Sequence, residues 1–152
     1  MYDVEYKTYI KKLTQNGYKK VNIPELEEKI IEIYVNKNGN VKSLRLFENG
    51  YKIKDVKLSE VKNGYLKYNI YTTDKQCKCR MLAQDIYNTF NYTNCSNNDI
   101  YYLDDNKKNC NIDNLVSVNT LIEFYKEKNN IWGSVKMNKY VKNIIDTIKE
   151  FN

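Results

Sequence analysis

The sequence predicts an α+β fold with twisted antiparallel β-hairpins in the middle and helices added at both ends. Alternating, β-rich segments joined by Asn-Gly turns occupy residues 29–80. Amphipathic helical segments lie on either side of them. The chain has 152 residues, about the size of one domain, and neither a linker nor an internal repeat divides it. We therefore expect residues 1–152 to form a single domain.

The N-terminal segment, residues 1–27, is expected to be a helical extension. Residues 2–14 are predicted to form a helix, and Asn16-Gly17 is typical of a helix end. The apolar residues loosely share one side of that helix: Val4, Ile10 and Leu13. Pro24, with the glutamates that follow it, predicts a further helical turn, because proline and acidic side chains suit the start of a helix.

The central segment, residues 28–128, is expected to hold the core and to begin with a series of strands. They are predicted at "KIIEIYV" (29–35), "VKSLRLF" (41–47), "YKIKDVKL" (51–58), "YLKYNIY" (65–71) and "KQCKCR" (75–80). Hairpins are favoured by the turn "NKNGN" and by the pairs Asn49-Gly50 and Asn63-Gly64. The run "MLAQDIYNTF" then predicts a helix with Leu82, Ile86 and Phe90 on one face.

Two further helices are predicted towards the C-terminus. In "TLIEFYKEK", Thr120 is the expected N-cap and Glu123 completes a T-x-x-E capping box. Residues 129–152 are expected to contain an amphipathic helix capped by Ser134. Its apolar stripe is Met137, Val141, Ile144, Ile145 and Ile148. A helix of this length is marginal alone in water, so the stripe must be buried against something.

The charge balance is basic, with a net charge of +6 and a pI near 9.0. Such a balance suits nucleic acid or an acidic partner, but it also suits a lysine-coated surface. Arg45 and Arg80 are the only arginines, and acidic residues alternate with the lysines. Since arginine makes the bidentate contacts that read bases, this scarcity argues against sequence-specific DNA recognition and leaves weak, non-specific attachment open.

No apolar run is long enough to span a bilayer, and the N-terminus has no signal-peptide core, so no membrane contact is expected. The cysteines are accordingly expected to be reduced thiols of a protein made in the cytoplasm. Their spacing as Cys77, Cys79, Cys95 and Cys110 differs from the C-x₂₋₄-C pairs of structural zinc sites. We expect no metal and no other cofactor.

Four segments occur in the order typical of one family: "GNVKSL", "GYLKYNIY", "KCRMLAQDIYNTF" and "NIDNLVSV". Together they resemble the HNH homing endonucleases common in phages, with their G-x-V-x-S strand, G-Y-L strand, H-R-L-V-A helix and asparagine-rich loop. The resemblance covers about residues 28–128. It implies a ββα-metal finger, in which a histidine activates water and one divalent metal stabilises the transition state.

The resemblance also implies that this finger is degenerate. The general-base histidine falls on Tyr102, and the preceding metal ligand falls on Tyr101. The loop asparagine is kept as Asn114, and the helix ligand would be Glu123. The chain contains no histidine at all, which excludes the family's ordinary mechanism. We expect a protein that is not an enzyme and a loop that is kept for its shape.

The turn residues Asp104 and Asp105 leave a vestigial cation site open as an alternative to ordinary turn chemistry. The histidine that opens the family's H-R-L helix is replaced by Cys79, while Arg80 is retained. The resemblance therefore implies that framework residues such as Arg80 are kept while catalytic residues are lost.

Two functions from different classes follow. The first is a structural or interaction role, as an auxiliary, capsid-associated protein of a phage virion that contacts other protein chains of the assembly. Its interface is expected at Met137, Tyr140, Val141, Ile144 and Ile148. The alternative is a non-catalytic, cytoplasmic DNA-binding protein or regulator derived from a homing endonuclease.

Overall fold

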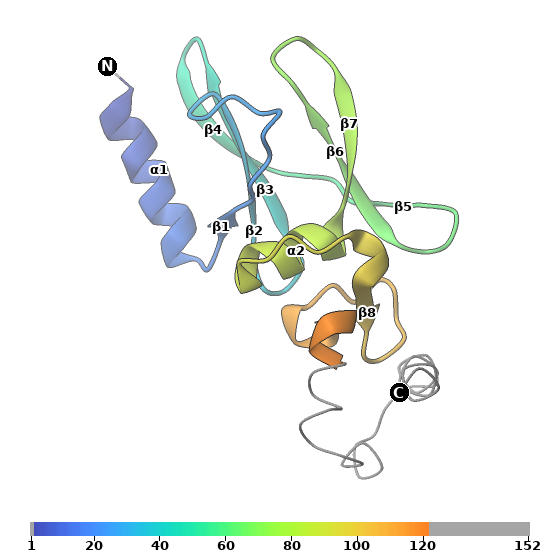
Figure 1. The fold of residues 1–152 in the computed structure, drawn as a ribbon. Coiled ribbons are helices and arrows are strands. Elements are labelled where there is room, and N and C mark those ends of the chain that lie inside the picture. Colours follow the sequence, from blue (N-terminus) through green and yellow to red (C-terminus); the bar gives the residue numbers. More distant parts are fainter. Residues whose placement is uncertain (1, 122–152) are drawn as a thin grey trace, which may run out of the picture.

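The computed structural model describes residues 2–121, which form three antiparallel sheets and two longer helices (Figure 1). The predicted mixed α+β architecture with antiparallel hairpins is confirmed in this part of the chain. Glu123, Ser134 and the proposed interface lie outside the described residues. The interface residues are Met137, Tyr140, Val141, Ile144 and Ile148.

The largest sheet has the strand order β1-β2-β3-β4. Its strands are β1 (Lys19–Lys20), β2 (Ile31–Val35), β3 (Val41–Phe47) and β4 (Gly50–Asp55). In the β2–β3 turn, the Asn36 side chain accepts hydrogen bonds from the backbone N–H groups of Asn38 and Asn40, and Gly39 has φ +93°. The predicted "NKNGN" hairpin is confirmed, because this turn chemistry sets the register that pairs Val35 with Val41.

The second sheet has the order β5-β6-β7 and leads directly into helix α2. Its elements are β5 (Ser59–Glu60), β6 (Leu66–Tyr71), β7 (Cys77–Met81) and α2 (Leu82–Asn91). The predicted strand at residues 51–58 is shorter than expected, because β4 ends at Asp55 and β5 is a separate strand. The predicted face of α2 is confirmed: Leu82 and Ile86 are fully buried, and Phe90 packs against the core.

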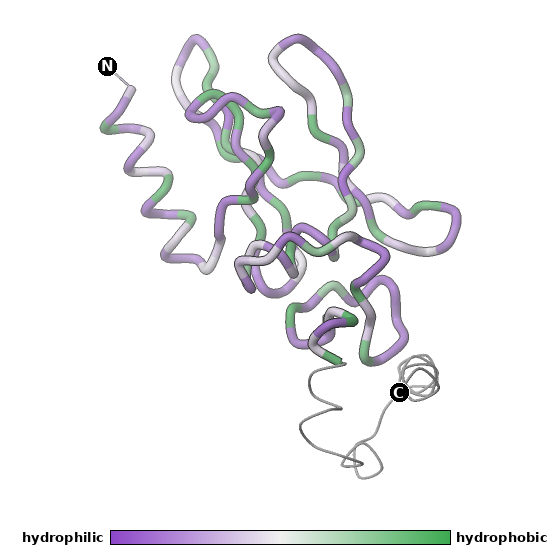
Figure 2. The backbone as a smooth tube through the Cα atoms, in the orientation of Figure 1, coloured by the Kyte–Doolittle hydropathy of each residue, from purple (hydrophilic) through white to green (hydrophobic). Residues whose placement is uncertain are grey.

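The main core lies where α2 contacts both larger sheets (Figure 1). Its most deeply buried side chains are Val35, Tyr68, Ile70, Leu82 and Ile86. Burying each apolar side chain of this size stabilises the fold by roughly 1.5–3 kcal/mol. Figure 2 shows that hydrophobic stretches alternate with hydrophilic ones along the described chain. No helix among residues 2–121 is long and apolar enough to cross a bilayer.

Helix α1 (Asp3–Gln15) packs on the four-stranded sheet through tyrosines. The rings of Tyr2, Tyr6 and Tyr9 surround Tyr51, with centroid separations of 6.5, 5.4 and 6.4 Å. The prediction that Val4 belongs to the packed face is wrong, since its side chain is 77% exposed. The amphipathic tyrosine ring fills that role because it buries its body while its hydroxyl keeps a polar partner.

Two carboxylates tie α1 to the sheet. Glu32 is buried on β2 and accepts hydrogen bonds from the hydroxyls of Tyr6 (2.8 Å) and Tyr34 (2.7 Å). Burial acts to raise the pKa of Glu32, but the tyrosine hydrogen bonds, the Lys29 backbone N–H and the charge of Lys20 together lower the pKa. From α1, Glu5 accepts the backbone N–H of Tyr51 at 2.8 Å. A Cβ at the neighbouring Gly50, whose φ is +113°, would lie 2.6 Å from the Glu5 carboxylate and would displace it.

The segment after α1 differs from the helical extension expected for residues 1–27. β1 adds an edge strand to the sheet, and Val21 and Ile23 enter the main core. Pro24 lies in a hydrogen-bonded turn and does not begin a helix. Alternating burial, with Val21 and Ile23 inside and Asn22 outside, favours extended backbone here over helix.

Candidate functional site

The loop expected from the sequence lies in a small hairpin of β8 (Ile100–Tyr102) and β9 (Leu115–Ser117). The short 3₁₀ helices η1 (Asn97–Asp99) and η2 (Ile112–Asn114) precede the two strands. Tyr102 and Asn114 lie close together, because the backbone N–H of Leu103 donates to the Asn114 carbonyl at 2.8 Å. Residues 118–121 are helical and follow β9 directly.

The start of that helix is earlier than the sequence predicted. The Ser117 hydroxyl accepts a hydrogen bond from the backbone N–H of Thr120 at 3.2 Å. A side chain that bonds the N–H three residues on is the N-cap, so Ser117 holds this position and Thr120 does not. The predicted capping box with Thr120 as N-cap is therefore wrong, although the predicted helix does begin within a few residues of Thr120.

The Asp104 carboxylate is bonded on both oxygens within its own loop. Oδ1 accepts the backbone N–H of Asn106 and the side-chain amide of Asn114, both at 2.8 Å. Oδ2 accepts the side-chain amide of Asn109 at 2.8 Å. The Asn109 hydrogen bond, with the others, lowers the pKa of Asp104. Three hydrogen bonds from N–H groups of the loop therefore hold this carboxylate in place.

Asn114 is the residue that closes the loop. Its side chain is 8% exposed and bonds in both directions. Oδ1 accepts the backbone N–H of Asp104 at 2.9 Å, while Nδ2 donates to Asp104 and to the carbonyl of Asn109 at 2.9 Å. The start and end of the loop are thereby joined through one amide, so Asn114 serves the shape of the hairpin.

Tyr101 and Tyr102, the tyrosines singled out from the sequence, are held as phenols. Tyr102 is 5% exposed, belongs to the main core, and packs against Tyr65 with ring centroids 5.9 Å apart. Burial raises its pKa, and the neighbouring Cys110 and Tyr65 raise it further. Tyr101 is half-buried, and burial together with the charge of Asp99 raises its pKa. Both hydroxyls stay protonated at neutral pH.

The four cysteines are free thiols, two on β7 and two in the loops that follow α2 and β8. Cys77 and Cys79 are exposed on β7, as expected for residues two apart on one strand. Burial raises the pKa of Cys110 to about 11. Within residues 2–121, no group of three or more Cys, Asp or Glu side chains is arranged to hold a metal ion.

A charged cluster stands where β7 meets α2. Arg80 bonds Asp85 twice, from Nη2 to Oδ1 at 2.6 Å and from Nε to Oδ2 at 3.1 Å. The hydroxyl of the fully buried Tyr68 donates to Oδ2 at 2.5 Å. Burial acts to lower the pKa of Arg80, but the hydrogen bonds and charge of Asp85 raise it. Arg80 therefore binds the carboxylate of Asp85, which is 4% exposed.

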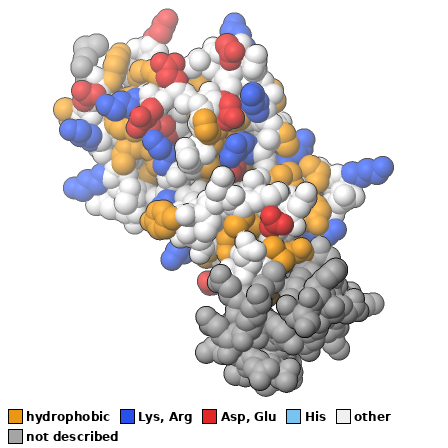
Figure 3. Space-filling view, in the orientation of Figure 1, with side chains coloured by type: hydrophobic (Ala, Val, Ile, Leu, Met, Phe, Trp, Pro, Cys, Tyr) orange, Lys and Arg blue, Asp and Glu red, His pale blue; other side chains and the backbone are white. Residues whose placement is uncertain are grey.

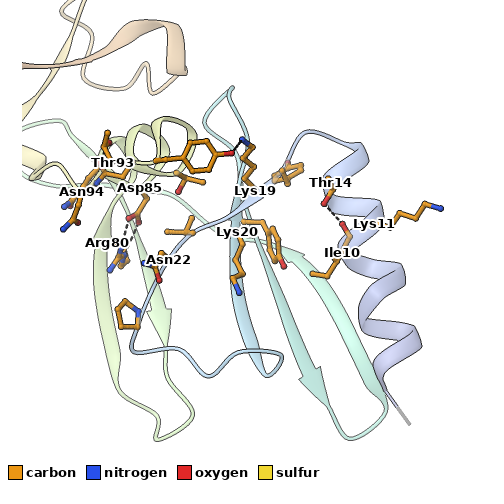
Figure 4. Close-up of a pocket in the computed structure, with 18 of the residues that line it drawn as sticks. Ile10, Lys11, Thr14, Lys19, Lys20, Asn22, Arg80, Asp85, Thr93 and Asn94 are labelled. Atoms are coloured by element: carbon orange, nitrogen blue, oxygen red, sulfur yellow. Dashed lines mark hydrogen bonds and ion pairs between the residues drawn. The ribbon is translucent and has the colours of Figure 1, made fainter. Parts of the chain in front are cut away.

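A groove of about 1370 Å³ runs between α1 and α2, with β1 and the residues after it as its floor (Figure 4). We call it the α1–α2 groove. Its basic lining residues are Lys7, Lys11, Lys19, Lys20 and Arg80. Asp85 is the only acidic residue among the described ones that line it. Figure 4 shows Lys11 pointing away from the groove, whereas Lys19 reaches from β1 towards α2. Because Arg80 is paired with Asp85, and Lys20 with Glu28 and Glu32, the positive charge of the groove comes mainly from Lys7 and Lys19.

Sequence reasoning did not find this groove. Lys19 and Tyr92 are 73 residues apart, and the Lys19 ammonium lies 2.7 Å from the Tyr92 hydroxyl. No spacing rule connects such positions, and the doublet Lys19-Lys20 is ordinary in a lysine-rich chain. The one available signal was the position of Tyr92 shortly after a predicted helix.

Comparisons with known proteins found no relative of this chain. No protein-family model, no curated protein and no solved structure that was searched matches the chain. What the molecule does is therefore inferred from its own residues.

Proposed function

We propose that this chain is a non-catalytic, HNH-homing-endonuclease-like protein that acts through protein contacts, as an auxiliary, capsid-associated component of a phage virion. The observation that carries the proposal is the closed β8–β9 loop. Asp104 has both oxygens bonded within the loop, and Asn114 joins its ends. A loop built to hold a divalent metal would converge several such oxygens on the ion instead of bonding them to its own N–H groups.

The order of elements supports the family resemblance. The hairpin β8–β9 is followed by helical residues 118–121, which is the arrangement of a ββα finger. Ahead of it come β3, β6 and α2, at the segments that carry the family's other motifs. These elements agree with an HNH-like framework in both order and type.

The chemistry of the replaced residues supports the loss of activity. Hydrolysis of the HNH type needs a base that gives up its proton near neutral pH. Tyr102 stands at the base position, and its burial raises a pKa that is already near 10. Its ring also fills the main core beside Tyr65. Tyr102 thus stabilises the fold where a histidine would have activated water.

The surface supports contacts with proteins. In Figure 3 acidic and basic side chains are interspersed on the visible face, with hydrophobic side chains between them. Several lysines are paired with carboxylates, as Lys42 is with Asp55 (3.2 Å) and Lys108 with Glu60 (2.6 Å). A mixed surface of this kind suits a protein partner better than a uniform phosphate backbone.

Light scattering on the full chain tests the interaction role. We expect a mass above the 18.2 kDa of one chain, because the proposal has the predicted C-terminal stripe buried against another chain and not only on the protein's own sheet. Ile144→Asp should lower that mass, since it places a charge in the stripe. Asn143→Asp is the matched control beside the stripe and should leave the mass unchanged. A monomer that binds random duplex DNA tightly at physiological salt would contradict the proposal.

Non-catalytic nucleic-acid binding is the second candidate. The observation that favours it is the α1–α2 groove, whose lining includes several cations and one acid that is already paired with Arg80. The net charge of +6 acts in the same direction. The scarcity of arginine argues against reading of base edges, so such binding would be non-specific in sequence.

A further inference from the structure

We propose that the α1–α2 groove binds single-stranded nucleic acid, with Tyr92 as a stacking platform for a base and Lys19 as the contact to a phosphate. This inference rests on the second candidate function and is independent of the protein-contact role. It adds to that candidate function a binding site, two contact residues and a preference for single-stranded over double-stranded nucleic acid.

Tyr92 is presented to solvent at the edge of the groove. Its side chain is 81% exposed, the highest value among the exposed large hydrophobic residues of the described part. It is the C-cap of α2 and has φ 54° and ψ 42°, the left-handed conformation. Helices commonly place glycine at a left-handed C-terminal residue, because a Cβ is strained there. A tyrosine held in this way offers a ring face to a ligand at the expense of the fold.

Lys19 brings a positive charge to the same place. Its ammonium lies 4.8 Å from the centroid of the Tyr92 ring and 5.3 Å from that of Phe90. Within residues 2–121 it forms no ion pair with a carboxylate. The charge is therefore available to a phosphate. A cation beside an exposed aromatic ring is the combination with which proteins hold single strands.

The other groove residues fit the same ligand. Asn22, Thr93 and Asn94 are exposed on its lining and present amide and hydroxyl groups that can bond bases or sugars. Arg80 and Lys20 already contact carboxylates, Arg80 at 2.6 Å from Asp85 and Lys20 at 3.4 Å from Glu28. They add less positive charge to the groove than Lys19 does.

A single strand fits better than a duplex for two reasons. Tyr92 can stack only on a base whose face is uncovered, and duplex stacking covers the faces. The groove also lacks the arginine fork that reads base edges from the major groove, because Arg80 is occupied by Asp85. Stacking with a lysine contact needs neither a free arginine nor a fixed sequence.

Fluorescence anisotropy on the full chain tests this inference, using a labelled single-stranded DNA of about 15 nucleotides at about 0.15 M salt. We expect single-stranded binding at least about tenfold tighter than binding of the matching duplex.

Tyr92→Gly should weaken single-stranded binding about tenfold by removing the stacking face. It should leave thermal unfolding at the same or a higher temperature, because glycine accepts the left-handed conformation. Lys19→Gln should weaken binding and reduce the salt slope by about 0.7.

Two variants outside the groove are matched controls. Tyr71→Ala removes an exposed tyrosine from β6, and Lys57→Gln removes an exposed lysine from the β4–β5 connection. Both should leave binding unchanged. Equal losses in these controls, or unchanged binding in Tyr92→Gly and Lys19→Gln, would overturn the assignment of the site.

The remaining outcomes separate this inference from the function on which it rests. A duplex that binds as tightly as the single strand overturns the strand class but leaves nucleic-acid binding standing. Inorganic polyphosphate that competes as well as the single strand overturns the stacking role, because it has no bases. Absence of binding to either DNA at low salt overturns the inference and the second candidate together.

Discussion

Replacing Arg80 with alanine is expected to lower the free energy of unfolding by about 3 kcal/mol. The substitution leaves the Asp85 carboxylate, which is 4% exposed, without the cation that bonds it at 2.6 and 3.1 Å. Tyr68 alone then donates to that carboxylate. A buried charge that loses its partner is costly because the remaining group is kept from water. Urea denaturation of wild type and variant measures the difference.

The control for this prediction lies on the same strand. Lys78 is exposed on β7, and Lys78→Ala removes a positive charge without uncovering a buried partner, so its effect should stay within about 0.5 kcal/mol. The double variant Arg80→Ala with Asp85→Asn should regain part of the lost stability, because the unpaired charge is gone. If Arg80→Ala is as stable as wild type, the cluster has no structural role.

Replacing Asn114 with alanine is expected to lower the free energy of unfolding by about 2 kcal/mol. The change removes the acceptor of the Asp104 backbone N–H and the amide that donates to Asp104 and to the Asn109 carbonyl. Since Asn114 is almost fully buried, the groups it leaves behind cannot all regain water. A loss of this size would give Asn114 a structural role in the loop that needs no metal.

Asn98 provides the comparison for that experiment. It is exposed in η1, so Asn98→Ala should change the free energy of unfolding by no more than about 0.5 kcal/mol. Denaturation monitored by tyrosine fluorescence distinguishes the two variants. Equal stability of Asn114→Ala and Asn98→Ala would show that the amide network does not hold the loop.

Short-range sequence patterns, both turn residues and helical spacing, made much of the fold predictable. The β2–β3 hairpin and α2 follow from short-range signals, an Asn-Gly turn in one case and helical spacing of Leu82 and Ile86 in the other. The packed face of α1 was missed at Val4, because the helix buries tyrosines that rank as only moderately apolar. β1 was missed because a two-residue edge strand has no periodicity of its own.

The candidate site was predictable in part for a similar reason. The loop around Asn114 follows from a contiguous run of turn-forming residues, so its hairpin could be expected. The helix start at Ser117 was misplaced because Thr120 completes an equally good capping pattern. The α1–α2 groove could not be predicted, because it depends on a tertiary contact between Lys19 and Tyr92. The left-handed backbone of Tyr92 could not be predicted either, because glycine is the residue that usually indicates this conformation in a sequence.

Supercoiled plasmid DNA incubated with the full chain and Mg²⁺ or Mn²⁺ tests most directly the proposal that the chain does not hydrolyse DNA. We expect neither nicked nor linear plasmid, because Tyr102 is a buried phenol and the oxygens of Asp104 are bonded within the loop. Tyr102→Phe, which keeps the ring in the core, is the paired variant. Nicking by the wild-type chain that disappears in Tyr102→Phe would contradict the non-catalytic function.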